Sequence, residues 1–167
     1  MYIVRRSTHN PLIAPNLDHP FEARATFNPS PVQIGAMTHI LYRAIGNPDA
    51  LQGQAGMSTI GKGIMIDDKH VRDRRPFIAP EEPWEKFGCE DPRVTKFEGR
   101  YYIFYTALSE FPFKASGIKV AVAISKDLET IESRHLVTPF NAKAFSLFPK
   151  RVNGKIVGML TAHTDEP

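Results

Sequence analysis

The chain has 167 residues, of which 42% are hydrophobic and 23% charged, a composition usual for one globular domain with its own core. The formal charge of +3 is small and the basic residues are scattered, so nucleic-acid binding is not expected. The single cysteine excludes an internal disulfide, and no segment has the pattern of a signal peptide or a membrane span. We therefore expect a cytoplasmic protein without membrane contact.

Short strands separated by turn signals account for most of the sequence. Residues 1–24 carry three prolines among polar residues, which predicts an extended arm rather than a helix. Beyond the arm, apolar and β-branched runs are bounded by Gly, Asn, Asp and Pro, and no long amphipathic helix is found. The expected strands are 38–44, 59–66, 94–97, 100–106, 118–125, 148–152 and 155–162, with hairpin turns at Glu98-Gly99 and Asn153-Gly154. The sequence therefore predicts an all-β protein.

A repeat becomes visible when the hairpins are aligned. Three dipeptides ending in proline each precede a hairpin whose second strand is strongly apolar; they are Asn28-Pro29, Asp91-Pro92 and Phe148-Pro149. The first two hairpins are followed by a further strand and an acidic turn, at Asp67-Asp68 and at Asp127. A period of roughly 60 residues with about four strands is typical of a β-propeller blade with long loops. A plain antiparallel sandwich is the alternative.

The length of the chain limits how many blades it can hold. On this count it supplies about two and a half blades, whereas closed propellers have roughly four to eight. We therefore expect residues 1–167 to be the N-terminal part of a single, longer propeller domain. An open set of blades leaves strand edges uncovered, so association into a homo-oligomer is a further expectation.

A series of short motifs occurs in a defined order along the chain. The motifs are Phe27-Asn28-Pro29, Leu41-Tyr42-Arg43-Ala44, Ser58-Thr59-Ile60-Gly61, Glu90-Asp91-Pro92-Arg93, Tyr101-Tyr102 with Tyr105-Thr106, Ser125-Lys126-Asp127-Leu128, and Lys143 before Phe148-Pro149. This series resembles glycoside hydrolase family 130, which contains inverting β-mannoside phosphorylases and some β-mannosidases built on five-bladed β-propellers. The resemblance runs from about residue 5 to the end of the chain and covers about half of the family's domain.

The resemblance implies an enzyme that cleaves β-mannosidic linkages with inversion, by phosphorolysis to mannose 1-phosphate. Inverting cleavage needs an acid that protonates the leaving oxygen and a nucleophile that arrives from the opposite face. Phosphate is already an anion, so cationic side chains must hold it and no general base is needed. The resemblance makes Asp91 the general acid, acting through a sugar hydroxyl, and makes Lys143 and His163 the phosphate-binding residues. It implies a mannoside oligosaccharide as substrate, and neither a cofactor nor a metal.

Five further residues are expected to bind the substrate: Asn28, Arg43, Glu90, Arg93 and Tyr105. The candidates also have structural interpretations. Asp91 before a proline is a common way to begin a turn. Arg43 lies inside an apolar strand, where its guanidinium needs an anionic partner such as Glu90. Tyr105 belongs to a strand, where aromatic residues are usually core.

Two departures from the family pattern leave other functions open. The loop 109–117 offers only Lys114 where phosphorylases place arginines, and no arginine follows His163. Hydrolysis is therefore an alternative, and it would need a general base, for which Asp165 and Glu166 are candidates in this chain. A non-catalytic, carbohydrate-binding half-propeller is the second alternative.

Overall fold

A computed structural model describes residues 3–47 and 56–163. Within these ranges the regular structure consists of β-strands and three-residue 3-10 helices, which confirms the all-β prediction. The strands are β1 (Ala25–Ile34), β2 (Met37–Ile45), β3 (Ser58–Met65), β4 (Val71–Ile78), β5 (Gly88–Phe97), β6 (Arg100–Leu108), β7 (Ile118–Ser125), β8 (Ser133–Leu136), β9 (Ala142–Leu147) and β10 (Gly158–Ala162). The 3-10 helices are η1 (Pro20–Glu22), η3 (Pro83–Glu85) and η4 (Ala115–Gly117). No helix in the described ranges is long and apolar enough to cross a membrane.

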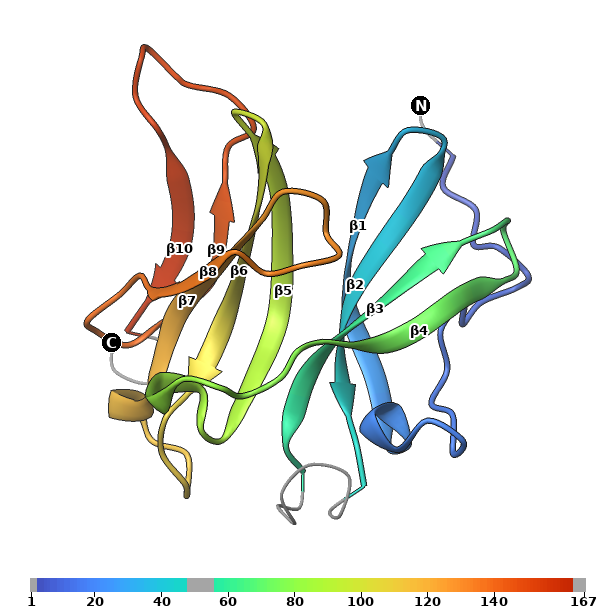
Figure 1. Ribbon diagram of the computed structural model, residues 1–167, viewed down its shortest axis with the longest axis horizontal. Coiled ribbons are helices and arrows are strands. Elements are labelled where there is room, and N and C mark those ends of the chain that lie inside the picture. The colour runs from blue at the N-terminus through green and yellow to red at the C-terminus, as the bar shows by residue number, and fades with distance from the viewer. Residues whose placement is uncertain (1–2, 48–55, 164–167) are drawn as a thin grey trace.

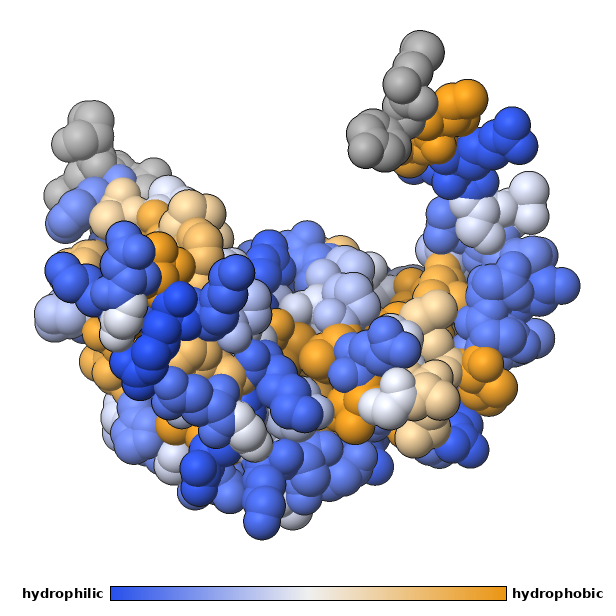
Figure 2. All heavy atoms as spheres, turned by 90° about the horizontal axis from the view of Figure 1, so that it is seen from above, coloured by the Kyte–Doolittle hydropathy of each residue, from blue (hydrophilic) through white to orange (hydrophobic). Residues whose placement is uncertain are grey.

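Hydrogen-bonded pairing gives an eight-stranded sheet, β1 to β8, and a two-stranded sheet, β9 and β10 (Figure 1). The larger sheet consists of two antiparallel four-stranded parts, β1–β4 and β5–β8, which we call the first and second sheets, and the pair β9 and β10 is the third sheet. A single parallel pairing, Ser58 with Gly88, joins the first two sheets. The first strands of these sheets, β1 and β5, lie side by side (Figure 1). Seen from above, the molecule is an open crescent with a hollow between its two ends (Figure 2).

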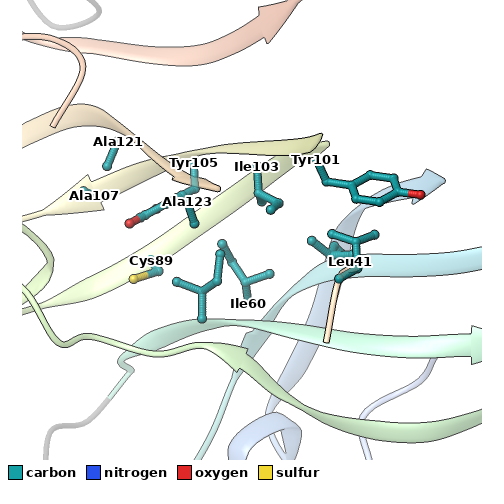
Figure 3. Close-up of a cluster of buried hydrophobic side chains, with 11 residues drawn as sticks. Leu41, Ile60, Cys89, Tyr101, Ile103, Tyr105, Ala107, Ala121 and Ala123 are labelled. Carbon is teal, nitrogen blue, oxygen red and sulfur yellow. The ribbon is translucent and has the colours of Figure 1, made fainter. Parts of the chain in front are cut away.

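The first and second sheets pack face to face over the main hydrophobic core. Leu41 and Ile60 come from the first sheet, and Ile103 and Tyr105 come from the second; each is at most 2% exposed (Figure 3). Small residues of β6 and β7, among them Ala121, fill the space between the larger side chains. Alternate residues of each strand face this core, so the intervening residues point to the outer faces.

Two strands that contain prolines were not among the strands expected from the sequence. β1 includes Pro29 and Pro31, and β4 includes Pro76. Among the described strands, β1 pairs only with β2 and β4 only with β3. A proline lacks an N–H group, but a strand at a sheet edge can lack one donor without breaking a ladder on both sides. The omission of these two strands was therefore wrong.

The third hairpin also differs from the prediction. The turn at Asn153-Gly154 is confirmed, because both residues have positive φ and Val152 pairs with Lys155 across it. The predicted first strand, 148–152, is wrong: the ladder is formed by β9, which ends before Phe148, and by β10. Pro149 lies between that ladder and the turn and has no N–H group to donate.

The acidic turns of the repeat have the same structure in both sheets. Asp67 Oδ1 accepts hydrogen bonds from the backbone N–H groups of Lys69 and His70, at 2.7 and 2.8 Å. Asp127 Oδ1 accepts from the two corresponding N–H groups after it, at 2.7 and 3.0 Å. Both aspartates close the turn before the last strand of their sheet, which is the Asx-turn geometry. This part of the predicted repeat is confirmed.

A second repeated device was not predicted from the sequence. In the first sheet, the fully buried carboxylate of Glu22, in the Pro-Phe-Glu helix η1, accepts a 2.6 Å hydrogen bond from the Tyr42 hydroxyl. It also pairs with Arg74 of β4 at 2.9 Å. One buried carboxylate thereby ties the segment before β1 to the second and fourth strands of the sheet.

The second sheet contains the same arrangement. Glu85, in the Pro-Trp-Glu helix η3, is fully buried, accepts a hydrogen bond from the Tyr105 hydroxyl and pairs with Arg134 of β8 at 2.7 Å. The two sheets are therefore copies of one supersecondary unit, related by an offset of about 60 residues.

Candidate active site

The first strand of each sheet carries the same β-bulge. In the first sheet, Phe27 pairs with Arg43 and Ser30 pairs with Leu41, so three steps along β1 match two steps along β2. The corresponding pairs are Glu90–Thr106 and Arg93–Phe104 in the second sheet, and Lys143–Thr161 and Ser146–Met159 in the third. A bulge re-aims the side chain of the extra residue and is common beside functional sites.

One residue in each bulge has a left-handed backbone. These residues are Asn28 with φ of 50°, Asp91 with φ of 54° and Ala144 with φ of 52°. The third repeat therefore begins at Ala144, and its assignment to Phe148-Pro149 was wrong. Proline follows the bulge residue in the first two sheets, but the repeated feature is the left-handed conformation, which does not require a proline.

Four of the predicted site residues meet at the first two bulges. Asn28 Nδ2 donates a 2.6 Å hydrogen bond to Asp91 Oδ1. Arg43 places Nη1 at 3.6 Å from the same oxygen, and its Nη2 donates to Glu90 Oε1. The Arg43 guanidinium also lies 4.8 Å from the centre of the Phe27 ring. The anionic partner that Arg43 was expected to need is therefore present in both adjacent carboxylates.

Glu90 is the most buried member of this group, at 8% exposure. Burial raises the pKa of Glu90, Arg43 and Lys143 oppose that rise, and Asp91 adds to it. The Ser58 hydroxyl lies between the two partners, accepting from Arg43 Nε at 2.9 Å and donating to Glu90 Oε1 at 3.4 Å. Ser58 was part of a sequence motif but was not predicted as a site residue.

Two of the expected substrate-binding residues take no part in these contacts. Tyr105 is 2% exposed, sits in the core between the sheets and hydrogen-bonds Glu85 (Figure 3). Arg93 Nη1 donates to the carbonyl of Pro92 at 2.9 Å, and no carboxylate in the described ranges lies within ion-pairing distance of it. The structure therefore places Tyr105 in the core, and Arg93, two residues after Asp91 in β5, makes no ion pair with the carboxylates in the described ranges.

The two residues expected to hold phosphate lie in the third sheet. Lys143 occupies the bulge position that Glu90 occupies in the second sheet, and its charge acts on the Glu90 carboxylate. His163 follows β10, and its ring stacks on Phe140 with 5.6 Å between ring centres. Asp165 and Glu166, the candidate bases for hydrolysis, lie outside the described residues. In the part of the chain that the structure describes, no group of three His, Cys, Asp or Glu side chains could hold a metal ion.

A separate cavity of about 640 Å³ lies between the N-terminal arm and the first sheet. Its walls include Leu12 and Ile13 of the arm and Tyr42 of β2, which faces away from the core residue Leu41. None of the predicted site residues lines it. The cavity nevertheless adjoins the first bulge, because Phe27 and Pro29, on either side of Asn28, also line it.

A family model for glycoside hydrolase family 130, described as beta-1,4-mannooligosaccharide phosphorylase, matches residues 4–167. The chain belongs to glycoside hydrolase family 130. It is 30% identical over 167 residues to a 1,2-beta-oligomannan phosphorylase of Thermoanaerobacter sp. (strain X514), a match that covers 99% of this chain and 55% of the relative. It is 28% identical to a beta-1,2-mannobiose phosphorylase of the same strain, with 94% and 54% covered.

Solved structures of similar proteins show the same fold. A glycosyl hydrolase from Bacteroides ovatus matches with a TM-score of 0.76 and 24% identity, covering 94% of this chain and 52% of that one. The beta-1,2-mannobiose phosphorylase from Listeria innocua, in complex with beta-1,2-mannobiose, matches with a TM-score of 0.75 and 23% identity, covering 93% and 57%. The family 130 chain described here thus spans about half the length of the relatives it matches.

Proposed function

We propose that residues 1–167 supply about two and a half blades of a five-bladed β-propeller, with residues 1–24 as an extended arm. Two observations support this architecture. The first and second sheets are copies of one four-stranded unit with their first strands side by side, and the third sheet repeats the bulge of the first two. The chain also spans about half the length of its family 130 relatives.

We further propose that the protein is an inverting β-mannoside phosphorylase in which Asp91 is the general acid. The observation that carries this proposal is the set of contacts around Asp91. One carboxylate oxygen is anchored by Asn28 and faces Arg43, and a second carboxylate, Glu90, is held next to it. A carboxyl group fixed through one oxygen can present the other to a reacting group.

In the proposed reaction, Asp91 gives its proton to the oxygen of the glycosidic bond, through a sugar hydroxyl. The bond from that oxygen to the anomeric carbon breaks, and a phosphate oxygen forms a bond to the same carbon from the opposite face. The products are mannose 1-phosphate of inverted configuration and the shortened mannoside. The charge of Lys143 acts on Glu90, and Lys143 with His163 is the proposed phosphate site.

Hydrolysis is the second candidate reaction. The observation that favours it is the small number of cations, because loop 109–117 holds only Lys114. The curated relatives are named as phosphorylases, which favours phosphorolysis. Because these relatives act on β-1,2-linked mannosides by name, β-1,2-mannobiose is the first substrate to test.

The deciding assay measures mannose 1-phosphate and free mannose released from β-1,2-mannobiose with and without phosphate. Phosphorolysis predicts mannose 1-phosphate only when phosphate is present, whereas hydrolysis predicts two free mannoses in either case. Asp91→Asn should lower turnover by roughly 100-fold or more while sugar binding is kept, because the acid is lost and the shape is not. Asp73→Asn is the matched control, since Asp73 is an exposed aspartate in the same left-handed conformation on the outer strand β4. Full turnover in Asp91→Asn would show that the acid is another residue.

A further inference from the structure

Ala144 stands in the third sheet where Asn28 and Asp91 stand in the first two. All three residues have φ between 50° and 54° at the same step of the same bulge. Asparagine and aspartate adopt this left-handed conformation more readily than alanine does, because their side chains can hydrogen-bond locally. Ala144 is exposed, and its backbone conformation favours asparagine or aspartate over alanine. The presence of alanine at this position therefore needs an explanation other than backbone preference.

The first two sheets show what a side chain at this position reaches. Asn28 extends from its bulge to the equivalent residue of the next sheet and bonds Asp91 Oδ1 at 2.6 Å. The neighbouring first strands β5 and β9 are also adjacent, since Thr95 Oγ1 donates to the Leu147 carbonyl at 3.1 Å. If β9 lies on β5 as β5 lies on β1, a longer side chain at position 144 would point toward Asp91 from the side opposite Asn28, which a methyl group does not reach.

The two oxygens of Asp91 consequently have different surroundings. Oδ1 accepts from Asn28 and faces Arg43, while Oδ2 has no hydrogen-bond donor among the residues described here. An oxygen that accepts an N–H bond and faces a guanidinium is the poorer site for a carboxyl proton, so the proton belongs on Oδ2. A donor reaching Oδ2 would favour the ionised carboxylate and work against an acid.

We propose that Ala144 is a positioning residue that keeps Oδ2 of Asp91 uncapped, so that this oxygen can carry and deliver the proton. The proposal rests on the function assigned above to Asp91. It gives the third bulge a role of its own: the first bulge anchors the acid, the second supplies it, and the third leaves its proton-bearing oxygen accessible.

Two substitutions whose new side chains have the same shape test this arrangement. Ala144→Asn adds an amide that can donate to Oδ2, so turnover at neutral pH should fall by about tenfold or more. The high-pH limb of the pH–activity profile, on which activity is lost as pH rises, should move to lower pH. Ala144→Asp adds a carboxylate beside Asp91, so the same limb should move to higher pH through like-charge repulsion. Both variants should fold, since both residues tolerate the left-handed conformation.

The matched control is Asn153→Asp, which adds the same charge at another left-handed position, in the exposed turn before β10. Its pH profile should coincide with that of the unchanged protein. Opposite shifts in the two Ala144 variants cannot come from a purely structural effect, because the side chains have the same shape. If both variants keep normal turnover and pH limbs while Asp91→Asn is inactive, this inference fails and the proposed function stands.

A second measurement does not depend on turnover. The carboxyl ¹³C resonance of Asp91 should titrate at lower pH in Ala144→Asn than in Ala144→Asp, with the unchanged protein between them. Three coincident titration curves would overturn the inference even if the protein had no phosphorylase activity. The loss of activity in the unchanged protein would, by contrast, overturn only the proposed function.

Discussion

The pair of Arg43 and Glu90 holds the candidate site together, and Arg43→Met tests what it contributes. Methionine keeps an unbranched apolar side chain that can pack on Phe27, but it removes the charge. Glu90 then loses its hydrogen-bonded cation, and Ser58 loses the donor at 2.9 Å. The expected result is a large loss of stability together with loss of turnover.

The magnitude follows from the burial of the two side chains. Removing one partner of a buried ion pair costs about 3–5 kcal/mol, because the other charge stays buried without compensation. The Arg43 side chain is 19% exposed and that of Glu90 is 11% exposed, and Ser58 still donates to the carboxylate. These features place the expected loss near the lower end, at about 3 kcal/mol of unfolding free energy.

The loss should depend on pH in a definite direction. Burial already raises the pKa of Glu90 in the folded protein, and Arg43 opposes that rise, so Arg43→Met should raise it further. A carboxyl group whose pKa is higher in the folded than in the unfolded protein does not affect the unfolding free energy at a pH where it is protonated in both states. As pH rises from the pKa of the unfolded state through the pKa of the folded state, the group lowers the unfolding free energy. The gap between the unchanged protein and Arg43→Met should therefore be small near pH 4 and largest above pH 7.

Urea unfolding at a series of pH values measures this gap. The control is the double variant Arg43→Met with Glu90→Gln, in which the more buried carboxylate is also removed; it should recover most of the stability at pH 7 but none of the turnover. A gap that stays constant from pH 4 to pH 8, or a double variant as unstable as Arg43→Met, would refute the reasoning. Either result would mean that the pair is not the main charge interaction of Glu90.

Two further predictions concern the core of the sheets. Tyr42→Phe removes a hydrogen bond to the buried Glu22, and Tyr105→Phe removes one to the buried Glu85. Each substitution should lower the unfolding free energy by about 1.5–3 kcal/mol in urea titrations. A negligible loss in both variants would show that the two carboxylates do not need the tyrosine hydroxyls. Burial, with the nearby Glu85, raises the pKa of Cys89 well above its usual value, so a thiol reagent should label Cys89 only after unfolding. Rapid labelling of the native protein would contradict the burial of this thiol.

The local patterns of the sequence were sufficient for the β-structure that depends on neighbours in the chain. The hairpin formed by β5 and β6 was predicted from apolar runs around Glu98-Gly99, and both turn residues have the positive φ that such a turn needs. Asp67 and Asp127 were predicted to end strands, and each does so through bonds to N–H groups two and three residues later. These interactions are local, so sequence spacing specifies them.

The motifs also predicted part of the candidate site. Asn28, Arg43, Glu90 and Asp91 were all named from the sequence, and the structure brings them together across strands 63 residues apart in the chain. Tyr105 was predicted as a site residue because it lies in a motif, but its side chain points into the core between the first and second sheets. In a strand the direction of a side chain alternates at every residue, so a one-residue difference in register decides between the site and the core.

What the sequence by itself determined was the class of fold, the repeat of strands and acidic turns, and the residue types at the first two bulges. Only the tertiary structure decided which residues are equivalent between sheets. Proline marked the first two bulges but was absent from the third, so Ala144 could be identified only from the pairing of β9 with β10. The buried hydrogen bonds and ion pairs of Glu22 and Glu85 could not be predicted from the sequence either. Each glutamate binds a tyrosine about 20 residues away and an arginine about 50 residues away, and these residues come together only in the folded sheet.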